Sequence, residues 1–234
     1  MSRRPILYKM DASPPARAVI MVAEILDLSI DLKDLNPLLR EQDAPEFVKK
    51  NPMKTIPIYE ENDFSLADSH AIILYLMDKY ARPRNYHLYP ADKRKRAIVH
   101  QRLFFDSGIL FPSLQAVMVP TYGGKLTEMT QSQIKKIVHA YSILDAYLRD
   151  TLYVADDLIT IADISIISTM GSLNGLHPVN ERFVKFCIRS QLFANSYFCR
   201  TIKLWNSLPA HVFPPSYDPG SFKRSVKKHL CVPA

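Results

Sequence analysis

Two predicted helix starts in this 234-residue chain carry polar side chains beside backbone N–H groups that are suited to holding an anion. Ser13 stands directly before Pro14, and because proline is favoured at the first position of a helix, we predict that Ser13 caps a helix over residues 16–28. Asp68 and Ser69 begin a second predicted helix. The first backbone N–H groups of a helix have no partner inside it and its dipole is positive there, so both places attract anions.

Pro57 marks a third special position, within a run of strand-forming residues at 54–59. Proline has no N–H group, so it stands at a sheet edge, at a bulge, or after a cis bond that turns backbone groups toward a ligand. Turn residues at 60–63 and a return strand at 64–66 follow. The apolar face of the next helix is formed by Ile72, Ile73, Leu76 and Tyr80. Residues 51–80 are therefore predicted to form a ββα unit.

Each of these positions also has a purely structural interpretation. A serine at a helix start is most often only its cap, which applies to Ser13 and Ser69 alike. Pro57 taken alone fits an ordinary edge strand. The combination of these residues at this spacing is what favours a binding site.

Further strand and helix signals before residue 51 complete this half of the chain. We predict a strand at 4–8, a second strand at 29–35 and a short helix at 44–50, which has Pro45 at its start. With the helix at 16–28 between the two strands, the order is βαβ, and the ββα unit comes next. This order predicts a thioredoxin-like α/β domain.

Helical patterns dominate after a proline-bearing connection at 82–92. A helix predicted at 93–119 carries two stripes, which imply two buried or half-buried faces, and Pro112 is expected to kink it. The first stripe consists of Val99, Leu103, Leu110, Leu114 and Val117. The second stripe consists of Phe104, Phe111, Gln115, Met118 and Tyr122. Another helix is predicted at 130–152, so the second domain is expected to be all-α.

A capping signature marks the start of one more helix at Thr160. The Thr160 side chain is expected to accept from the Asp163 N–H group, and the Asp163 side chain to accept in return from the Thr160 N–H group. Ile159 is expected to pack on Ile164. The signature predicts a structural role, so Asp163 is not a candidate for a catalytic acid.

Composition changes sharply at residue 182. The residues beyond it hold eight of the 30 Lys and Arg residues but one of the 23 acidic residues, so the whole formal charge of +7 lies there. The same stretch contains Cys187, Cys199, Cys231 and the sole tryptophan, Trp205. We therefore predict four parts, namely a domain at 1–81, a linker at 82–92, a helical domain at 93–182 and a basic tail at 183–234.

Composition also narrows the class of protein. A hydrophobic content of 47% and a charged content of 23% are ordinary for a globular chain. The N-terminal apolar run is too short for a signal peptide, and no stretch approaches the roughly 18 apolar residues of a membrane helix, so we expect a cytoplasmic protein. Three cysteines without a C-x-x-C spacing or a histidine cluster argue against zinc, a redox dithiol or a disulfide framework.

The motif TIP at 55–57, followed by a hairpin, an acidic residue and a serine, resembles the glutathione-binding half of the cytosolic glutathione transferases. In that family the proline is cis, and the backbone before it pairs with the cysteinyl part of glutathione. The resemblance gives these roles to Pro57 and Ile56. It assigns the γ-glutamyl end of glutathione to Asp68 and Ser69, with His70 beside them.

The motif YxxxxSPPxRAVxM at 8–21 is similar to the first loop of the insect delta and epsilon transferases. The catalytic hydroxyl of those classes falls on Ser13. Gln42 and Lys54 stand where the epsilon class usually has histidines near the glycine carboxylate of glutathione. Lys54 keeps a cation there and Gln42 keeps a hydrogen-bond donor. A solvated lysine before a strand is the structural alternative for Lys54.

The chemistry that the resemblance implies needs a thiolate. A thiol with a pKa near ~8.5 is mostly protonated at neutral pH, whereas only the thiolate is a good nucleophile. A hydroxyl that donates to sulfur at the positive end of a helix favours the anion. Because Ser13 is not a cysteine, the protein adds no nucleophile of its own, and conjugation is favoured over thiol–disulfide exchange.

The stretch RLFFDSGILFP at 102–112 resembles the epsilon-class helix whose second face lines the pocket for the electrophile. The implied pocket residues are Leu35, Phe111, Gln115, Met118 and Tyr122. An apolar stripe of this kind is more often a core face. The resemblance further implies glutathione as co-substrate without a metal, a small hydrophobic electrophile as second substrate, and a homodimer.

The tail contains RTIKLWNSLP and SYDPGSFK and resembles the end of non-LTR retrotransposon reverse-transcriptase reading frames. It carries none of the polymerase carboxylates. Three hypotheses follow: a glutathione-conjugating enzyme, a non-enzymatic binding or scaffold protein whose electrophile pocket is disabled, and a nucleic-acid binder. The last depends on the tail alone, where a solvated basic segment is favoured over nucleic-acid contact.

Overall fold

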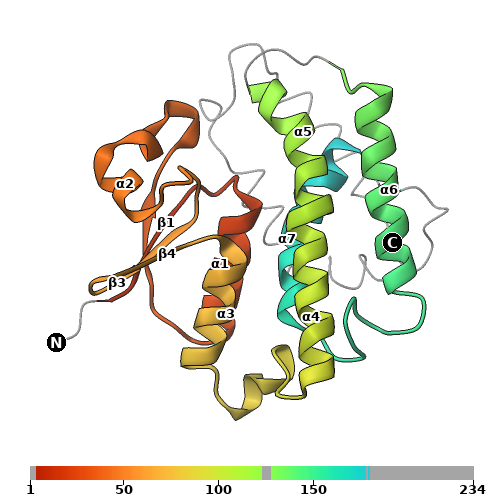
Figure 1. The fold of residues 1–234 in the computed structure, drawn as a ribbon, viewed down its shortest axis with the longest axis horizontal. Helices are drawn as coiled ribbons and strands as arrows, with labels where there is room; N and C mark the ends of the chain where they lie inside the picture. The colour runs from red at the N-terminus through yellow and green to blue at the C-terminus, as the bar shows by residue number, and fades with distance from the viewer. Residues whose placement is uncertain (1–3, 123–127, 178, 180–234) are drawn as a thin grey trace, which may run out of the picture. The chain divides into compact units, whose positions relative to one another are not determined.

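The computed structural model divides into two compact units (Figure 1). The residues that the structure describes are 4–122, 128–177 and 179. The first unit comprises Met1–Leu103 and Thr151–Ser168, and the second comprises Phe104–Asp150 and the residues from Thr169 on. These units cut across the predicted helical domain, and the domain boundaries expected at residues 81, 92 and 182 stay predictions.

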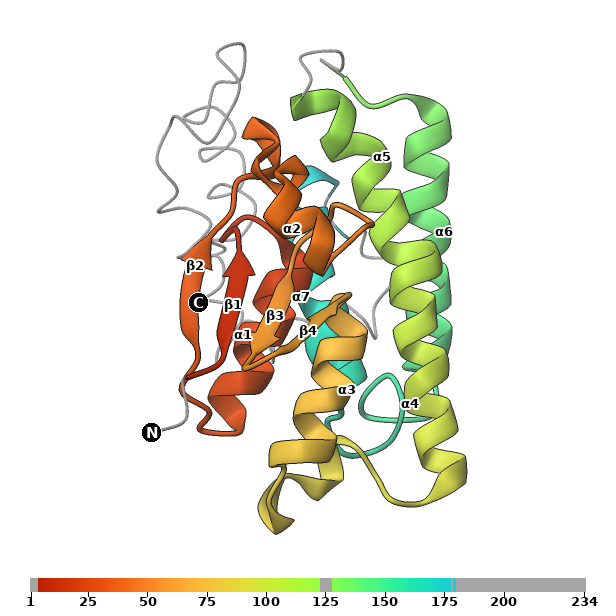
Figure 2. The same cartoon turned by 60° about the vertical axis from the view of Figure 1, so that its left-hand side comes forward.

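The first unit is built on one four-stranded sheet. Its strands are β1 (Ile6–Lys9), β2 (Asp31–Asp34), β3 (Ile58–Glu61) and β4 (Phe64–Ala67). Their spatial order is β2-β1-β3-β4, as Figure 2 shows. β2 runs parallel to β1, whereas β3 is antiparallel to both of its neighbours. The parallel pair is joined by a helical crossover and the last pair by a tight turn, so the predicted thioredoxin-like α/β fold is confirmed.

Helices and short turns surround this sheet. The helices are α1 (Pro14–Ile25), α2 (Pro45–Lys50) and α3 (Ser69–Tyr80), and the 3-10 turns are η1 (Pro37–Leu39), η2 (Glu41–Asp43) and η3 (Pro83–Leu88). α1 and α3 lie side by side. The predicted stripe of α3 is confirmed at Ile72, Ile73 and Leu76, which are fully buried, while Tyr80 is half-buried.

Several element ends differ from the sequence prediction for local backbone reasons. α1 ends at Ile25 rather than near residue 28, because the chain turns at Asp27, whose φ of 53° lies in the left-handed region. β3 includes Glu60 and Glu61, which were predicted as turn residues. The tight turn is instead centred on Asn62, with φ of 55°, a conformation that asparagine tolerates.

Side chains alternate along β1 and supply two cores. Ile6 and Tyr8 point to one face, where they form a buried cluster with Leu35 and Ile58; Phe47 and Ile56 pack against it. Leu7 points to the opposite face and is fully buried. Burial on both faces explains why β1 reads as a continuous apolar run and not as an alternating one.

The helix predicted at 93–119 is interrupted near its middle. Its parts are α4 (Lys93–Phe105), the π-helical turn η4 (Asp106–Leu110) and α5 (Phe111–Tyr122). η4 widens the helix just before Pro112, where a kink was expected, and such a turn accommodates a residue whose ring would clash with the preceding turn. The first stripe is confirmed, since all five of its members are at most 3% exposed.

The second stripe is not a uniformly covered face. Phe104 is 72% exposed and Gln115 is exposed, whereas Phe111 and Met118 are half-buried. The prediction of two buried or half-buried faces therefore holds for the first stripe and only partly for the second.

The segment Lys93–Thr121 corrects the expectation about membrane spans. It is one helix in the described part of the chain that is long and apolar enough to cross a membrane by length and composition. Core helices of water-soluble proteins pass the same test, and Leu103, Leu110 and Leu114 on this helix are buried. The sequence argument missed it because Asp106, Ser113 and Gln115 interrupt the apolar residues, so that no continuous apolar run of this length exists.

The second unit pairs α5 with α6 (Gln131–Tyr147). Thr130 caps α6 through the Gln133 N–H group, and Gln133 answers by accepting from the Thr130 N–H at 2.7 Å. The Gln133 Nε2 atom donates to the Ala116 carbonyl at 2.6 Å, which ties the first turn of α6 to α5. The helix predicted at 130–152 thus exists but ends at Tyr147.

The start of α7 (Ile161–Leu176) confirms the Thr160 signature and corrects one detail. Asp163 Oδ2 accepts from the Thr160 N–H at 2.8 Å, as predicted. The Thr160 hydroxyl, however, donates to the same oxygen at 2.9 Å. The other oxygen, Oδ1, accepts from the Val154 N–H at 2.9 Å, so Asp163 also fastens the preceding loop. Its carboxylate is fully used in structure.

The predicted tail at 183–234, with its three cysteines and Trp205, lies outside the described residues.

Candidate active site

Ser13 lies at the N-cap of α1, as predicted. Its backbone is extended, with φ of −79° and ψ of 113°, and its Oγ accepts from the Ala16 N–H at 3.4 Å. The Ser13 N–H donates to the Met10 carbonyl at 2.9 Å, so the residue is fixed from both sides. A hydroxyl that accepts through oxygen keeps its hydrogen for donation to a ligand. Ser13 is half-buried, which leaves part of it accessible.

The Ile56–Pro57 peptide bond is cis, which decides among the three interpretations of Pro57. Pro57 comes immediately before β3, a central strand paired on both sides. It therefore does not lie in an edge strand. Pro57 is buried and Ile56 is half-buried.

Asn51 supports this turn, and sequence reasoning missed it. The side chain is 1% exposed, and its Nδ2 donates to the Thr55 carbonyl at 2.8 Å and to the Thr55 hydroxyl at 3.0 Å. Its Oδ1 accepts from the Met53 N–H at 3.0 Å. Asn51 thus ties together the loop that leads into the cis bond. The available signal was an asparagine directly before a proline at the end of a helix, which favours a turn.

Asp68 and Ser69 open α3 as predicted. Asp68 has an unusual backbone, with φ of 73°, and its Oδ1 accepts from the N–H groups of His70 at 2.9 Å and Ala71 at 3.1 Å. Ser69 is buried, while Asp68 is exposed. The Nε2 atom of His70 lies 2.8 Å from the Ser165 hydroxyl oxygen on α7, within the first unit.

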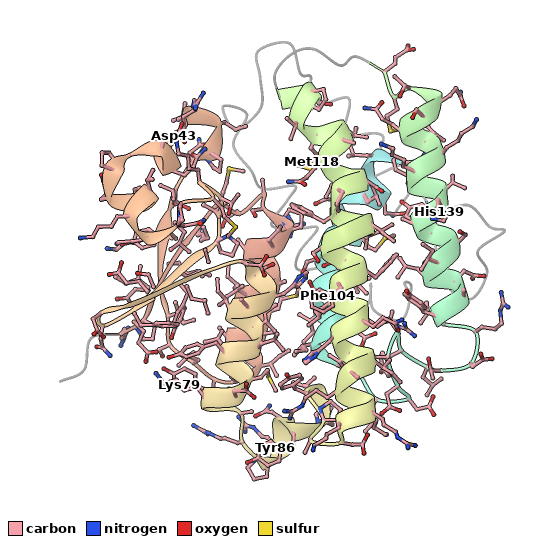
Figure 3. The ribbon with its side chains drawn as sticks, in the orientation of Figure 1. Asp43, Lys79, Tyr86, Phe104, Met118 and His139 are labelled. Atoms are coloured by element: carbon pink, nitrogen blue, oxygen red, sulfur yellow. The ribbon has the colours of Figure 1, made fainter. Side chains whose placement is uncertain are left out.

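Lys54 lies near Asp43, the residue that follows Gln42 in the chain. Lys54 Nζ lies 3.9 Å from Asp43 Oδ1, and Asp43, labelled in Figure 3, belongs to η2 together with Gln42. Gln42 Oε1 is buried and has no hydrogen-bond partner among the residues that the structure describes. Lys54 is exposed and adopts a left-handed φ of 56°. A cation and an unsatisfied amide oxygen thus belong to the same loop region.

The predicted electrophile residues fall into two groups. Leu35 is 2% exposed and packs in the β1 cluster of the first unit. Phe111, Gln115 and Met118 lie on α5 in the second unit, and the side chain of Tyr122 lies outside the described residues. Figure 3 labels Met118 on α5 and Phe104 on α4. Because each unit is defined separately, a pocket formed by both groups stays a prediction.

The described residues were also compared with the requirements of a metal-binding site. No group of three or more His, Cys, Asp or Glu side chains in the described segments is arranged to hold a metal ion.

Comparison with known proteins gives one consistent result. Residues 7–84 match the family model described as "Glutathione S-transferase, N-terminal domain". The chain is 41% identical to glutathione S-transferase 1 of Manduca sexta over 177 residues, which is 75% of this chain and 80% of that protein.

Solved structures agree. A glutathione transferase homologue of Drosophila mojavensis, crystallised with bound glutathione, has a TM-score of 0.81 and 35% identity, covering 97% of this chain and 98% of that one. An epsilon-class glutathione S-transferase of the housefly, Musca domestica, has a TM-score of 0.75 and 33% identity, covering 96% of each chain.

Proposed function

This chain belongs to the glutathione S-transferase family, and on that premise we propose that it conjugates reduced glutathione to small hydrophobic electrophiles, with the Ser13 hydroxyl stabilising the thiolate. One observation carries the proposal. The Ser13 hydroxyl sits at the N-cap of α1, in the same compact unit as the cis bond at Pro57 and the Asp68 cap of α3.

The reaction needs two events. The glutathione thiol loses its proton to solvent while the Ser13 hydroxyl donates a hydrogen bond to the resulting thiolate, and the dipole of α1 stabilises the same charge. The thiolate then forms a carbon–sulfur bond with the electrophile, whose leaving group departs with the bonding electron pair. No change of oxidation state at the protein is required.

The tripeptide is held by the residues around these two helix starts. Asp68 Oδ1 is occupied by its cap, so its other oxygen pairs with the γ-glutamyl ammonium, and the buried Ser69 with His70 completes that end. The Ile56 backbone before Pro57 pairs with the cysteinyl part. Lys54 provides the positive charge for the glycine carboxylate, and Gln42 donates through its amide nitrogen.

The electrophile is received by the half-buried apolar side chains of α5, Phe111 and Met118, together with Gln115 and Tyr122. Leu35 packs in the core of the first unit, so its part in this pocket stays a sequence prediction. A homodimer, which the family resemblance implies, belongs to the same proposal. We further propose that the protein is cytoplasmic, uses no metal cofactor, and binds neither membranes nor nucleic acid.

We further propose that residues 183–234 derive from a retrotransposon reading frame and take no part in the chemistry. The support is the resemblance of two motifs in the tail, RTIKLWNSLP and SYDPGSFK.

A direct test combines binding and turnover. Calorimetry on the full chain should show stoichiometric glutathione binding, and an activated aryl halide should be converted to its glutathione adduct with release of halide. Saturable glutathione binding without adduct formation for any of several activated aryl halides would favour the non-enzymatic binding protein instead.

A further inference from the structure

The loop that carries Ser13 is held by a buried arginine. Arg17 is 6% exposed, and its Nη1 atom donates to the carbonyls of Asp11 at 3.3 Å and Ala12 at 3.2 Å. Its Nη2 atom donates to the Ser168 carbonyl of α7 at 2.9 Å. All of these groups belong to the first unit. One guanidinium therefore joins the two residues before Ser13 to a separate helix.

Helix geometry explains how Arg17 reaches this loop. Arg17 lies four residues after Ser13, and its N–H donates to the Ser13 carbonyl at 3.0 Å in the first turn of α1. Side chains on a helix lean toward its N-terminus, so the guanidinium returns over the loop from which the helix starts. Only arginine offers a planar fork of donors that can serve several carbonyls at once.

The position of Arg17 is energetically costly for a residue that would serve only to stabilise α1. A cation in the first turn of a helix opposes the macrodipole, and burying a guanidinium is costly unless its donors are satisfied. Three carbonyl acceptors, bound by the Nη1 and Nη2 atoms, offset part of that cost. An arginine placed only to stabilise α1 would be better placed in its last turn.

A second buried cation holds the same loop from the other side. Lys9 is 7% exposed, and its Nζ lies 2.5 Å from Asp11 Oδ1 and 2.6 Å from Asp34 Oδ1. Asp11 is thus fixed by its side chain through Lys9 and by its carbonyl through Arg17. The backbone between β1 and Ser13 is left with little freedom.

We propose that Arg17 is a positioning residue for the reaction: by holding the Asp11 and Ala12 carbonyls against α7, it aims the Ser13 hydroxyl at the sulfur of bound glutathione. This inference rests on the proposed role of Ser13. Arg17 does not touch the substrate and acts only through the serine. A hydrogen bond weakens steeply with misalignment, so a small movement of this loop is enough to lose it.

The competing explanation is that the positive charge of Arg17 stabilises the thiolate directly. Arg17→Lys separates the two explanations, because lysine keeps the charge but carries its donors on one nitrogen and cannot span the loop carbonyls and the Ser168 carbonyl as the two guanidinium nitrogens do. Arg96→Met is the matched control, since Arg96 Nε also donates to a loop carbonyl, that of Pro90 at 2.8 Å, elsewhere in the first unit.

The experiment is a thiolate absorbance titration of glutathione bound to the full chain. Arg17→Met and Arg17→Lys are both expected to raise the pKa of the bound thiol, by roughly 1 unit, and Arg96→Met is expected to leave it unchanged. In a Ser13→Ala background, the Arg17 variants are expected to add no further shift.

Two results would overturn the inference. One is a wild-type pKa of the bound thiol in Arg17→Lys, whether or not Arg17→Met shifts it. The other is a shift in Arg17→Met that adds fully to that of Ser13→Ala. If Ser13→Ala alone does not move the pKa of the bound thiol, the proposed role of Ser13 is wrong. This outcome is distinct from a failure of the Arg17 proposal, in which Ser13→Ala shifts the pKa but the Arg17 variants do not behave as expected.

Hydrogen exchange is a second measurement, which remains informative if a variant folds poorly. The Ser13 N–H is bonded to the Met10 carbonyl, so its hydrogen exchange reports the order of this loop. Arg17→Lys is expected to speed exchange at Ser13 several-fold while core amides of β1 keep their rates. Equal exchange at Ser13 in Arg17→Lys and wild type would contradict the positioning role.

Discussion

His70 and Ser165 are joined across the first unit, with His70 Nε2 lying 2.8 Å from Ser165 Oγ. His70 follows Ser69 in the first turn of α3, and Ser165 lies in the early part of α7. The helix start assigned to the γ-glutamyl end of glutathione is therefore bonded to the helix that Arg17 also contacts. α7 holds both parts of the candidate site.

We predict that His70→Ala and Ser165→Ala each lower the free energy of unfolding by about 1 kcal/mol and weaken glutathione binding a few-fold. Urea unfolding and calorimetry measure the two effects. In the double mutant, the losses should be less than additive by at least about 0.5 kcal/mol, because the two side chains share one bond. Full additivity would show that they are not coupled.

Asp68 has two roles that substitution can separate. Asp68→Ala should remove the cap of α3 and the charge, and so lower the free energy of unfolding by about 1 kcal/mol and weaken glutathione binding by tenfold or more. The binding loss should exceed any loss in bound-state turnover, because the γ-glutamyl ammonium is held equally in the ground and transition states.

Asp68→Asn is the matched control. Asparagine keeps an acceptor for the His70 and Ala71 N–H groups, so stability should stay near that of the wild type while glutathione affinity still falls. A drop in kcat with an unchanged KM for glutathione, in either variant, would contradict the binding assignment.

Glu61 gives a prediction about acid stability. Burial alone would raise the pKa of this carboxyl, but hydrogen bonds from Lys79, Tyr80 and Tyr75 lower it to about 2 from an ordinary value of 4.5. The folded state therefore binds fewer protons than the unfolded state between these values. The stabilisation is complete above pH 4.5 and is lost as the pH falls toward 2.

The measurement is the free energy of unfolding between pH 5 and pH 2, a window set by the lowered pKa of Glu61. Glu61→Gln should be less stable than wild type at pH 5, and its stability should depend less on pH across this window. If the stability of the two proteins depends on pH in the same way, the pKa of Glu61 is not lowered in the folded state. Lys79, labelled in Figure 3, lies near the C-terminal end of α3, outside the candidate site.

The tail prediction concerns residues 183–234. Every candidate glutathione residue lies between Ser13 and His70, so deletion of the tail should leave glutathione affinity within about twofold of the full chain, less than ~0.5 kcal/mol. Calorimetry on both chains, after each is shown to be monodisperse, tests this. Loss of binding in a folded, truncated chain would place the tail in the site. Peptide mass spectrometry across residues 182–190 tests whether the tail is translated.

Local signals made much of the fold predictable. The caps at Ser13 and Asp68 and the first stripe of the long helix depend on neighbours in sequence and appear as expected. At Thr160 the Asp163 carboxylate accepts from the backbone N–H as predicted, but the Thr160 hydroxyl donates to that carboxylate. The turn predicted at residues 60–63 is confined to Asn62 and Asp63, because strand pairing with β4 extended β3 beyond its apolar run.

Contacts between distant residues were not predictable in the same way. Arg17 donates a hydrogen bond to the Ser168 carbonyl although 151 positions separate them, and neither residue type predicts this pairing. Asn51 was overlooked because its role depends on burial, which a polar side chain does not signal. Gln42 was expected to act as a donor, and the orphaned Oε1 emerges only from the packing around η2.

The most direct test of the account is the pKa of the glutathione thiol when bound to the wild type and to Ser13→Ala, measured by thiolate absorbance. Ser13→Ala should bind glutathione within a few-fold of the wild type, because the serine contributes little to holding the tripeptide. The account predicts that the pKa of the bound thiol rises by roughly one to two units in Ser13→Ala and that conjugation slows accordingly. An unchanged pKa in the variant would contradict the central role of Ser13.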